Sequence, residues 1–232
     1  MKFSGEGFGW KAPVEDREVL KGHIEDLAKE NRDLDNENGL REWDQQLKQE
    51  EIINLEQQIG RLGIDSLTGA QRREVFKNEL DRVFAMIRNE KLEQREGSIT
   101  PQRASLIFLD LDKFKQVNDT HGHLIGDRVL SSVSRILRDT LRATDVLARY
   151  GGDEFIALLP NTNEDDSVFV AEKLRVAIDS DPELRGFGVT ASIGVCSSDA
   201  STADDSDTFI KHADEAAYFA KRGGGNKVEV YR

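Results

Sequence analysis

The segment Arg149-Tyr150-Gly151-Gly152-Asp153-Glu154-Phe155 decides the fold of the C-terminal two thirds of this 232-residue chain. One short apolar run, residues 145–149, precedes its turn, and another, residues 155–159, follows it. Two such runs joined through Gly-Gly-Asp predict a β-hairpin. Its two acidic residues would lie at the tip, where loops can carry chemistry. Taken alone, such a turn is more often a solvated loop, so the interpretation depends on other acidic residues.

A second acidic pair ends the apolar run predicted as a strand over residues 104–112. The two-residue period of a strand places Asp110 and Asp112 on one face. If this strand neighbours the hairpin, Asp110 lies near Asp153 and Glu154. Three or four converging carboxylates bind a hard divalent cation, for which we expect Mg²⁺, with Mn²⁺ as an alternative. The competing interpretation is a helix-capping aspartate with solvated neighbours.

The order of predicted elements indicates an α+β fold. It is β-α-β-β-α-β with additions at both ends, which predicts a ferredoxin-like antiparallel sheet backed by helices, as in nucleotide cyclases and polymerase palms. The segment around Asn118 is predicted as a loop. The remaining predicted strands are residues 189–195 and 227–231, and the predicted helices are residues 71–94, 125–141, 165–180 and 207–222.

The N-terminal third has a different composition. Residues 1–16 predict a flexible tail, residues 17–64 a helical segment, and residues 65–232 a catalytic domain. Leucines and isoleucines follow a heptad register, which favours a long helix forming a parallel coiled-coil homodimer. A single helix packed on the catalytic domain is the alternative. A second, displaced stripe leads to the hypothesis that the coil has two registers. The register residues are Leu20, Leu27, Leu34, Leu55 and Leu62 with Ile24, Ile52 and Ile59, and the displaced stripe is Leu40, Trp43 and Leu47.

Composition excludes several classes of protein. The net charge of −12 argues against a surface that binds nucleic-acid polymers or anionic membranes. A nucleotide substrate is still possible, because a metal ion can offset local acidic charge. No apolar run approaches 18 residues, and the N-terminus lacks a signal-peptide pattern, so we expect no membrane span and a cytoplasmic location. The single cysteine, Cys196, excludes an intrachain disulfide and is expected in the core.

From about Asp65 to Arg232 the sequence resembles the GGDEF family, the diguanylate cyclases. The hairpin carries the family signature, and residues 65–69, Asp-Ser-Leu-Thr-Gly, resemble its Asp-x-Leu-Thr-Gly opening motif. Residues 70–74 depart from the usual Leu-x-Asn-Arg-Arg and keep only Arg73 in place. The family joins two GTP molecules into cyclic di-GMP and releases pyrophosphate. By resemblance, this chain is expected to do the same in a symmetric dimer.

The resemblance also assigns roles to the acidic residues. Asp110 and Asp153 are implied as side-chain metal ligands, and Leu111 as a backbone carbonyl ligand. Asp153 is the family's candidate for activating the ribose 3′-hydroxyl. Glu154 is implied as a catalytic residue that either binds the metal or supports it. Metal beside clustered carboxylates suits phosphoryl transfer.

Residues 114–127 resemble the family's guanine-recognition segment. Asn118 can hydrogen-bond the base, and Asp127 can accept from the N1–H and amine edge, which adenine does not offer. His123 aligns with a position that contacts the nucleotide or orders this segment. The remaining substrate-binding positions implied are Gly151, Gly152 and the phosphate-contacting Lys221.

Two further features bear on function. Gly225 stands where many members have arginine, so Arg222 or Lys227 would have to substitute in phosphate binding. Arg142 and Asp145 resemble the family's inhibitory Arg-x-x-Asp site, which implies product inhibition by cyclic di-GMP. The rival interpretation is an inactive receptor that binds cyclic di-GMP and signals through the coil. A generic coiled-coil scaffold is a third possibility.

Overall fold

The fold was analysed in a computed structural model, which describes residues 18, 21–27, 29, 48–49, 51–55, 63–88, 101–199 and 205–232. The predicted tail at residues 1–16 lies outside these residues. The chain divides into two units, one of residues 10–69 and one of residues 1–9 with 70–232. Each unit is described by itself.

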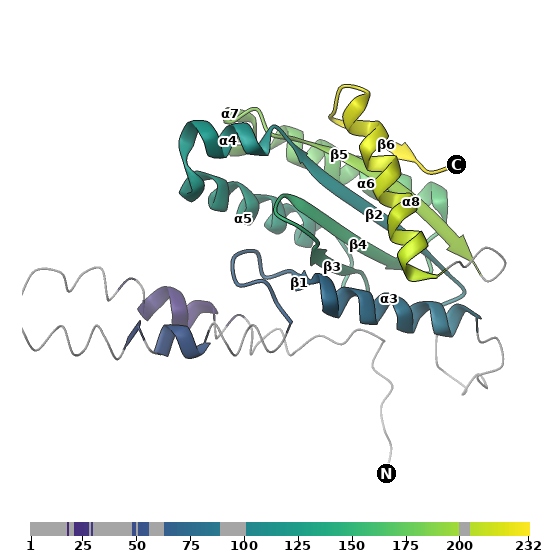
Figure 1. Ribbon diagram of the computed structural model, residues 1–232, viewed down its shortest axis with the longest axis horizontal. Helices are drawn as coiled ribbons and strands as arrows, with labels where there is room; N and C mark the ends of the chain where they lie inside the picture. The colour runs from purple at the N-terminus through teal and green to yellow at the C-terminus, as the bar shows by residue number, and fades with distance from the viewer. Residues whose placement is uncertain are drawn as a thin grey trace, which may run out of the picture. The chain divides into compact units, whose positions relative to one another are not determined.

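The larger unit is built on one mixed six-stranded sheet, ordered β1-β3-β4-β2-β5-β6 (Figure 1). Its four central strands pair antiparallel, whereas β1 pairs parallel with β3 and β6 parallel with β5. The strands are β1 Gln71–Arg72, β2 Arg103–Asp112, β3 Val146–Arg149, β4 Glu154–Pro160, β5 Thr190–Asp199 and β6 Lys227–Val230.

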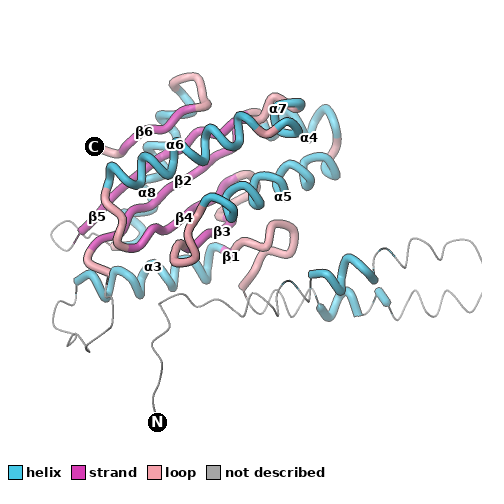
Figure 2. Tube along the Cα trace, turned by 180° about the vertical axis from the view of Figure 1, so that it is seen from behind, coloured by secondary structure: helices cyan, strands magenta, loops and turns pink. Residues whose placement is uncertain are grey.

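Helices cover both faces of this sheet. Helices α3 and α8 pack on one face, and the view from behind shows α5 and α6 over the other (Figures 1 and 2). The strands are therefore buried on both sides, which accounts for the unbroken apolar run in β2. The helices are α3 Arg73–Arg88, α4 Phe114–His121, α5 His123–Thr140, α6 Glu164–Ser180, α7 Pro182–Gly186 and α8 Ser206–Arg222.

The core between the sheet and the α3–α8 layer follows from helical periodicity. Apolar residues of α3 recur at the three- and four-residue spacing that places them on one face. They pack against alternate residues of β2 and β4 and against α8. Burying each such side chain stabilises the fold by about 1.5–3 kcal/mol. The buried residues of α3 are Phe76, Leu80, Val83, Phe84 and Ile87.

The predicted ferredoxin-like order is confirmed for the four central strands, but the prediction of a wholly antiparallel sheet is wrong at both edges. The edge strands β1 and β6 run parallel to their neighbours because each is reached by a crossover, not by a hairpin. The predicted helix starting at residue 71 in fact starts at Arg73, since Gln71 and Arg72 form β1. Cys196 is buried in the core, as predicted.

The segment predicted as a loop around Asn118 is instead helix α4. Its two buried residues, Phe114 and Val117, lie three positions apart and hold the helix against the domain. The polar sequence that follows Val117 favours a loop, and burial of these two apolar side chains outweighs that preference.

Gly194 in β5 fixes where helix α8 lies. A Cβ atom at this position would come 2.0 Å from the carbonyl oxygen of Ala213 and 2.3 Å from the amide nitrogen of Ala217. The backbones of α8 and β5 therefore approach as closely as only glycine permits. This contact sets the height of α8 over the sheet and with it the position of the residues at its C-terminal end.

The described helical residues of the smaller unit pack against each other. Ile24 and Leu27 form a cluster with Ile52 and Leu55, and Nε2 of His23 lies 3.3 Å from a carboxylate oxygen of Glu51. In one straight helix, residues this far apart in sequence would be about 40 Å apart. The prediction of one long helix is therefore wrong: these register residues pair within the chain. The displaced stripe lies outside the described residues.

None of the helices formed by the described residues combines the length and the apolar character needed to cross a membrane.

Candidate active site

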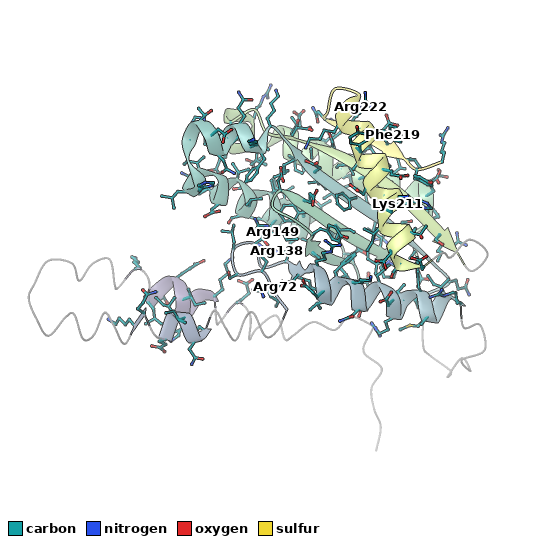
Figure 3. All side chains as sticks on the ribbon, in the orientation of Figure 1. Arg72, Arg138, Arg149, Lys211, Phe219 and Arg222 are labelled. Carbon is teal, nitrogen blue, oxygen red and sulfur yellow. The ribbon has the colours of Figure 1, made fainter. Side chains whose placement is uncertain are left out.

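The signature segment forms the predicted hairpin between β3 and β4. Arg149 and Phe155 are register partners, and the Tyr150 N–H donates to the Glu154 carbonyl at 2.8 Å. The Arg149 guanidinium donates to the Gly152 carbonyl from Nη2 at 2.7 Å and from Nε at 3.2 Å. Figure 3 labels Arg149 near Arg72, its register partner on β1. These bonds hold the turn that carries Asp153 in one conformation.

Aromatic packing anchors the base of the hairpin. The Tyr150 ring meets the Phe108 ring edge-on, with centroids 5.4 Å apart. The Arg73 guanidinium lies 4.3 Å from the centre of the Tyr150 ring, within range of a cation–π contact. Arg73 is the one residue that the chain keeps from the second part of the family's opening motif. Its contact connects the start of α3 to the signature hairpin.

The predicted approach of β2 to the hairpin is confirmed. Asp110 is the register partner of Glu154, and the Leu111 N–H donates to the Asp153 carbonyl at 3.3 Å. Burial raises the pKa of Asp110 and of Glu154, and the neighbouring acidic charges raise both further, while Lys221 lowers them. Carboxylates whose ionised forms are disfavoured in this way are suited to binding a cation. The Leu111 carbonyl remains a predicted ligand.

The predicted convergence of three or four carboxylates is not observed. Among the described residues, no three aspartate, glutamate, histidine or cysteine side chains lie close enough together to hold a metal ion by themselves. The residues predicted to hold the ion are Asp110 and Asp153, and Glu154 is the register partner of Asp110. Such a set fits Mg²⁺, which commonly binds one or two carboxylates, and substrate phosphates and waters complete its octahedron.

Helix α8 brings a cation to this carboxylate group. The Lys221 ammonium donates to Oδ1 of Asp110 at 2.5 Å. Asp214, two helical turns earlier on α8, contributes a negative charge that raises the pKa of Glu154, and burial raises the pKa of Asp214 itself. Sequence reasoning missed Asp214. Its spacing of seven residues from Lys221, which places both on one helix face, was the available signal.

Asp112, the other aspartate of β2, is buried and bound by neutral donors. Its carboxylate accepts hydrogen bonds from the hydroxyls of Thr190 and Ser192, both at 2.7 Å, and from the Asn226 N–H at 2.9 Å. Asp112 is thus stabilised without a cation, whereas Asp110 is paired with the Lys221 ammonium. Asp112 instead ties β2 to β5 and to the loop between α8 and β6.

The structure explains the glycine at position 225. Gly225 has a φ of 74°, a left-handed conformation that glycine adopts without strain. A Cβ atom there would lie 2.9 Å from the Asp112 carboxyl carbon. The loop between α8 and β6 therefore has no room for the family's arginine in this conformation.

Arg222 and Lys227, the two residues predicted as replacements for that arginine, have other contacts. Arg222 lies 5.8 Å from the centre of the Tyr218 ring. The ammonium of Lys227 donates to Glu229 at 2.5 Å. Their part in phosphate binding stays a prediction.

The residues predicted to recognise guanine lie where α4 meets α5. The side-chain oxygen of Asn118 is buried without a hydrogen-bond partner, and a Cβ atom on Gly126 would lie 1.9 Å from it. Asp127, the next residue, and His123 are both exposed on the first turns of α5. A buried polar atom without a partner is costly, so Asn118 is poised to receive a ligand donor.

The predicted inhibitory pair forms a tight turn. The Asp145 carboxylate accepts from the Arg142 N–H at 2.8 Å, and the Asp145 N–H donates to the Arg142 carbonyl at 3.0 Å. The Arg142 side chain is exposed. The turn immediately precedes β3, so it is positioned by the same hairpin as the signature.

The GGDEF family model, described as "Diguanylate cyclase, GGDEF domain", matches residues 62–227. The response regulator PleD of Caulobacter vibrioides is 34% identical over 180 residues, which is 75% of this chain and 37% of PleD. The chain thus spans little more than a third of the length of that relative.

Solved structures agree with this match. The GGDEF domain of DgcB from Caulobacter crescentus, in complex with c-di-GMP, superposes with a TM-score of 0.63 and 29% identity, over 73% of this chain and 95% of that one. The diguanylate cyclase SiaD of Pseudomonas aeruginosa, in complex with its activator SiaC, gives a TM-score of 0.61 and 32% identity, over 94% of this chain and 79% of that one. The shared signature hairpin, sheet and sequence therefore show that this chain belongs to the GGDEF family of diguanylate cyclase domains.

Proposed function

We propose that this chain is an active diguanylate cyclase that condenses two GTP molecules into cyclic di-GMP and two pyrophosphates. The observation that carries the proposal is the register pairing of Asp110 with Glu154, which places the end of β2 beside the signature turn. Asp110 also accepts a hydrogen bond from Lys221 there. Each of these positions holds the residue type that the reaction requires.

Asp153 and Asp110 would hold Mg²⁺, together with the Leu111 carbonyl, and Mn²⁺ could take its place. When bound, the ion would neutralise phosphate charge and lower the pKa of the attacking hydroxyl. Asp153 would accept the proton of the ribose 3′-hydroxyl. Glu154 would support the ion or bind it directly. Gly151 and Gly152 have no side chains of their own, which would let the nucleotide approach the backbone of the turn.

Guanine would bind between α4 and α5. The unpaired Asn118 oxygen would accept a hydrogen bond from the base, and the exposed Asp127 carboxylate would accept from the N1–H and amine edge. Adenine offers no N1–H, so this pair would favour GTP over ATP. His123, on the first turn of α5, would contact the nucleotide or order this segment.

The reaction needs two copies of the domain. Each 3′-hydroxyl attacks the α-phosphorus of the other GTP, and a symmetric product calls for a twofold dimer. We propose that two copies associate through the N-terminal unit, with paired helices in place of the single helices predicted. Association through this unit would raise the effective concentration of the second domain.

Two modes of regulation accompany this proposal. Cyclic di-GMP would inhibit by binding Arg142 and Asp145, where an exposed arginine can form bidentate contacts with phosphate or guanine. SiaD, which is matched over 94% of this chain, forms a complex with a protein activator. We therefore propose that the N-terminal unit receives an activating partner.

One observation supports a second candidate function. Gly225 replaces the family's arginine, so a receptor that binds cyclic di-GMP through Arg142 without making it is the alternative. The filled carboxylate positions favour the enzyme.

The deciding experiment is incubation of the purified chain, freed of bound product, with GTP and Mg²⁺, followed by chromatographic separation of the nucleotides. We expect cyclic di-GMP from the native protein and at least 10³-fold less from Asp153→Ala. An Asp139→Ala variant, changed on the exposed end of α5, is the matched control and should keep full activity. Tight cyclic di-GMP binding without synthesis, lost in Arg142→Ala, would support the receptor instead.

A further inference from the structure

Lys221 has one observed partner and one predicted partner. Its ammonium donates to Oδ1 of Asp110 at 2.5 Å, yet family resemblance assigns it to the substrate phosphates. A divalent ion bound by Asp110 would take up the same carboxylate oxygen that accepts the hydrogen bond from this ammonium. The contact with Asp110 therefore has to be exchanged during the catalytic cycle.

We propose that Lys221 is an exchangeable counterion: it neutralises Asp110 in the nucleotide-free site and transfers to the triphosphate when a divalent cation takes its place on Asp110. This inference rests on the proposed function, because it concerns the same site. In this proposal Lys221 contacts the phosphates and also couples metal binding to nucleotide binding.

The surroundings of the two residues support exchange. The Lys221 side chain is 43% exposed and the Asp110 side chain 22% exposed, so the ammonium can leave without breaking core packing. Among the described residues, Lys221 is the only side chain that hydrogen-bonds Asp110. Because Asp110 is half-buried, losing this cation without a replacement would leave a poorly solvated charge. Departure of Lys221 is therefore favourable only when another cation arrives.

Other nearby cations have their own contacts. Arg149 is bound to the Gly152 carbonyl, and Lys227 to Glu229. Gly225 contributes no charge where relatives carry arginine. Lys221 is thus the cation at the C-terminal end of α8 that already contacts Asp110, and its transfer would leave room for a divalent ion.

Exchange has a thermodynamic signature. In the absence of nucleotide, a divalent ion must displace Lys221 from Asp110 or bind beside a positive charge, which weakens its affinity. When the nucleotide is present, the triphosphate accepts the displaced ammonium. Metal and nucleotide should therefore bind cooperatively, and removal of the Lys221 charge should both tighten metal binding to the nucleotide-free protein and reduce this cooperativity.

The test measures Mn²⁺ binding to the nucleotide-free protein by electron paramagnetic resonance of the free ion. It compares the native chain with Lys221→Met and Lys221→Gln. Lys211→Met is the matched control, because Lys211 lies on the same helix and is paired with Glu215 (Figure 3). We expect both Lys221 variants to bind Mn²⁺ about fivefold more tightly than the native protein, and the control to bind it equally.

The second arm repeats the titration with a GTP analogue that has a methylene group between its α- and β-phosphorus atoms. The native protein should gain metal affinity on binding the analogue by a larger factor than the Lys221 variants do. Unchanged or weaker Mn²⁺ binding in both variants would overturn the exchange. Because neither arm requires turnover, an inactive chain would refute the proposed activity while leaving the metal measurement decisive.

Discussion

Two aspartates at the same end of β2 meet opposite environments. Asp110 is bound by one charged, partly exposed side chain from α8, whereas Asp112 is bound by two hydroxyls and a backbone N–H, all from ordered parts of the domain. The sequence places them two residues apart on one face of the strand. Their different partners indicate different tasks: Asp112 joins three segments permanently, and Asp110 holds a cation that can be replaced.

The difference shows how a fold keeps a reactive carboxylate available. A carboxylate that accepts hydrogen bonds from fixed donors on both oxygens has few lone pairs left to offer a metal ion, and separating it from those donors costs free energy. A carboxylate bound by a lysine with a flexible stem can exchange that partner. The network around Asp112 also fixes the loop after Lys221, so the rigid aspartate helps position the cation of the exchangeable one.

The largest effect on stability should come from removing the carboxylate of Asp112, which is bound by fixed donors. Asp112→Ala leaves two hydroxyls and the Asn226 N–H without their acceptor, which should lower the free energy of unfolding by about 3 kcal/mol. Urea unfolding followed by circular dichroism would measure it. Asp110→Ala, the matched variant two residues earlier, should change stability by less than about 1 kcal/mol. Equal losses in the two variants would show that the two environments do not differ energetically.

A smaller loss should follow from adding a side chain beside Asp112. Gly225→Ala forces a left-handed conformation and moves a methyl group to within 2.9 Å of the Asp112 carboxyl carbon, so we expect a loss of about 2 kcal/mol. Gly224→Ala is the control, because Gly224 has a φ of 110° with nothing within 4 Å. Its loss reports the backbone strain alone. If both variants lose equal stability, the Asp112 contact contributes nothing.

The smallest effect should be the change of protein stability with pH that comes from the titration of Asp110. Burial raises the pKa of Asp110 above its ordinary value of 3.8, more than Lys221 lowers it. Between the ordinary pKa and the raised one, Asp110 therefore holds its proton more often in the folded state than in the unfolded state. As a result, the native protein loses stability as pH rises toward the pKa of Asp110 in the folded state.

Asp110→Asn removes this titration. In a metal-free buffer containing a chelator, the stability of Asp110→Asn relative to the native protein should therefore increase as pH rises from about 4 and level off above the folded pKa. Thermal unfolding measured from pH 4.5 to 8 would follow it. A difference that stays constant across this range would contradict a raised pKa.

Much of this fold could be predicted from sequence because its strands carry strong signals. The Gly-Gly-Asp turn between apolar runs and the alternation at Asp110 and Asp112 specified the hairpin and its neighbour. Helix α4 could not be predicted, because only two of its residues, Phe114 and Val117, are buried and the following polar residues favour a loop. A two-residue strand such as β1 has no periodicity at all, so only tertiary pairing defines it.

The sequence was enough to predict which residues form the candidate site, but not which of them contact one another. Residue type and the family motifs indicated Asp110, Asp153 and Lys221, yet nothing in the sequence shows that Lys221 contacts Asp110. That contact depends on the height of α8 over the sheet, which Gly194 sets. In the N-terminal unit the heptad pattern indicated apolar pairing correctly, but a heptad does not distinguish a partner in the same chain from one in a second copy.

The short strand β1 has a mechanical consequence. The chain enters the larger unit at Ala70 and is at once hydrogen-bonded alongside β3, with Arg72 opposite Arg149, the residue before the signature turn. Along the backbone the two are separated by most of the first half of the domain, but across the sheet the separation is one strand spacing, about 4.8 Å. A pull on the chain at residue 70 would therefore displace the signature turn directly, before it is transmitted through any helix of the domain.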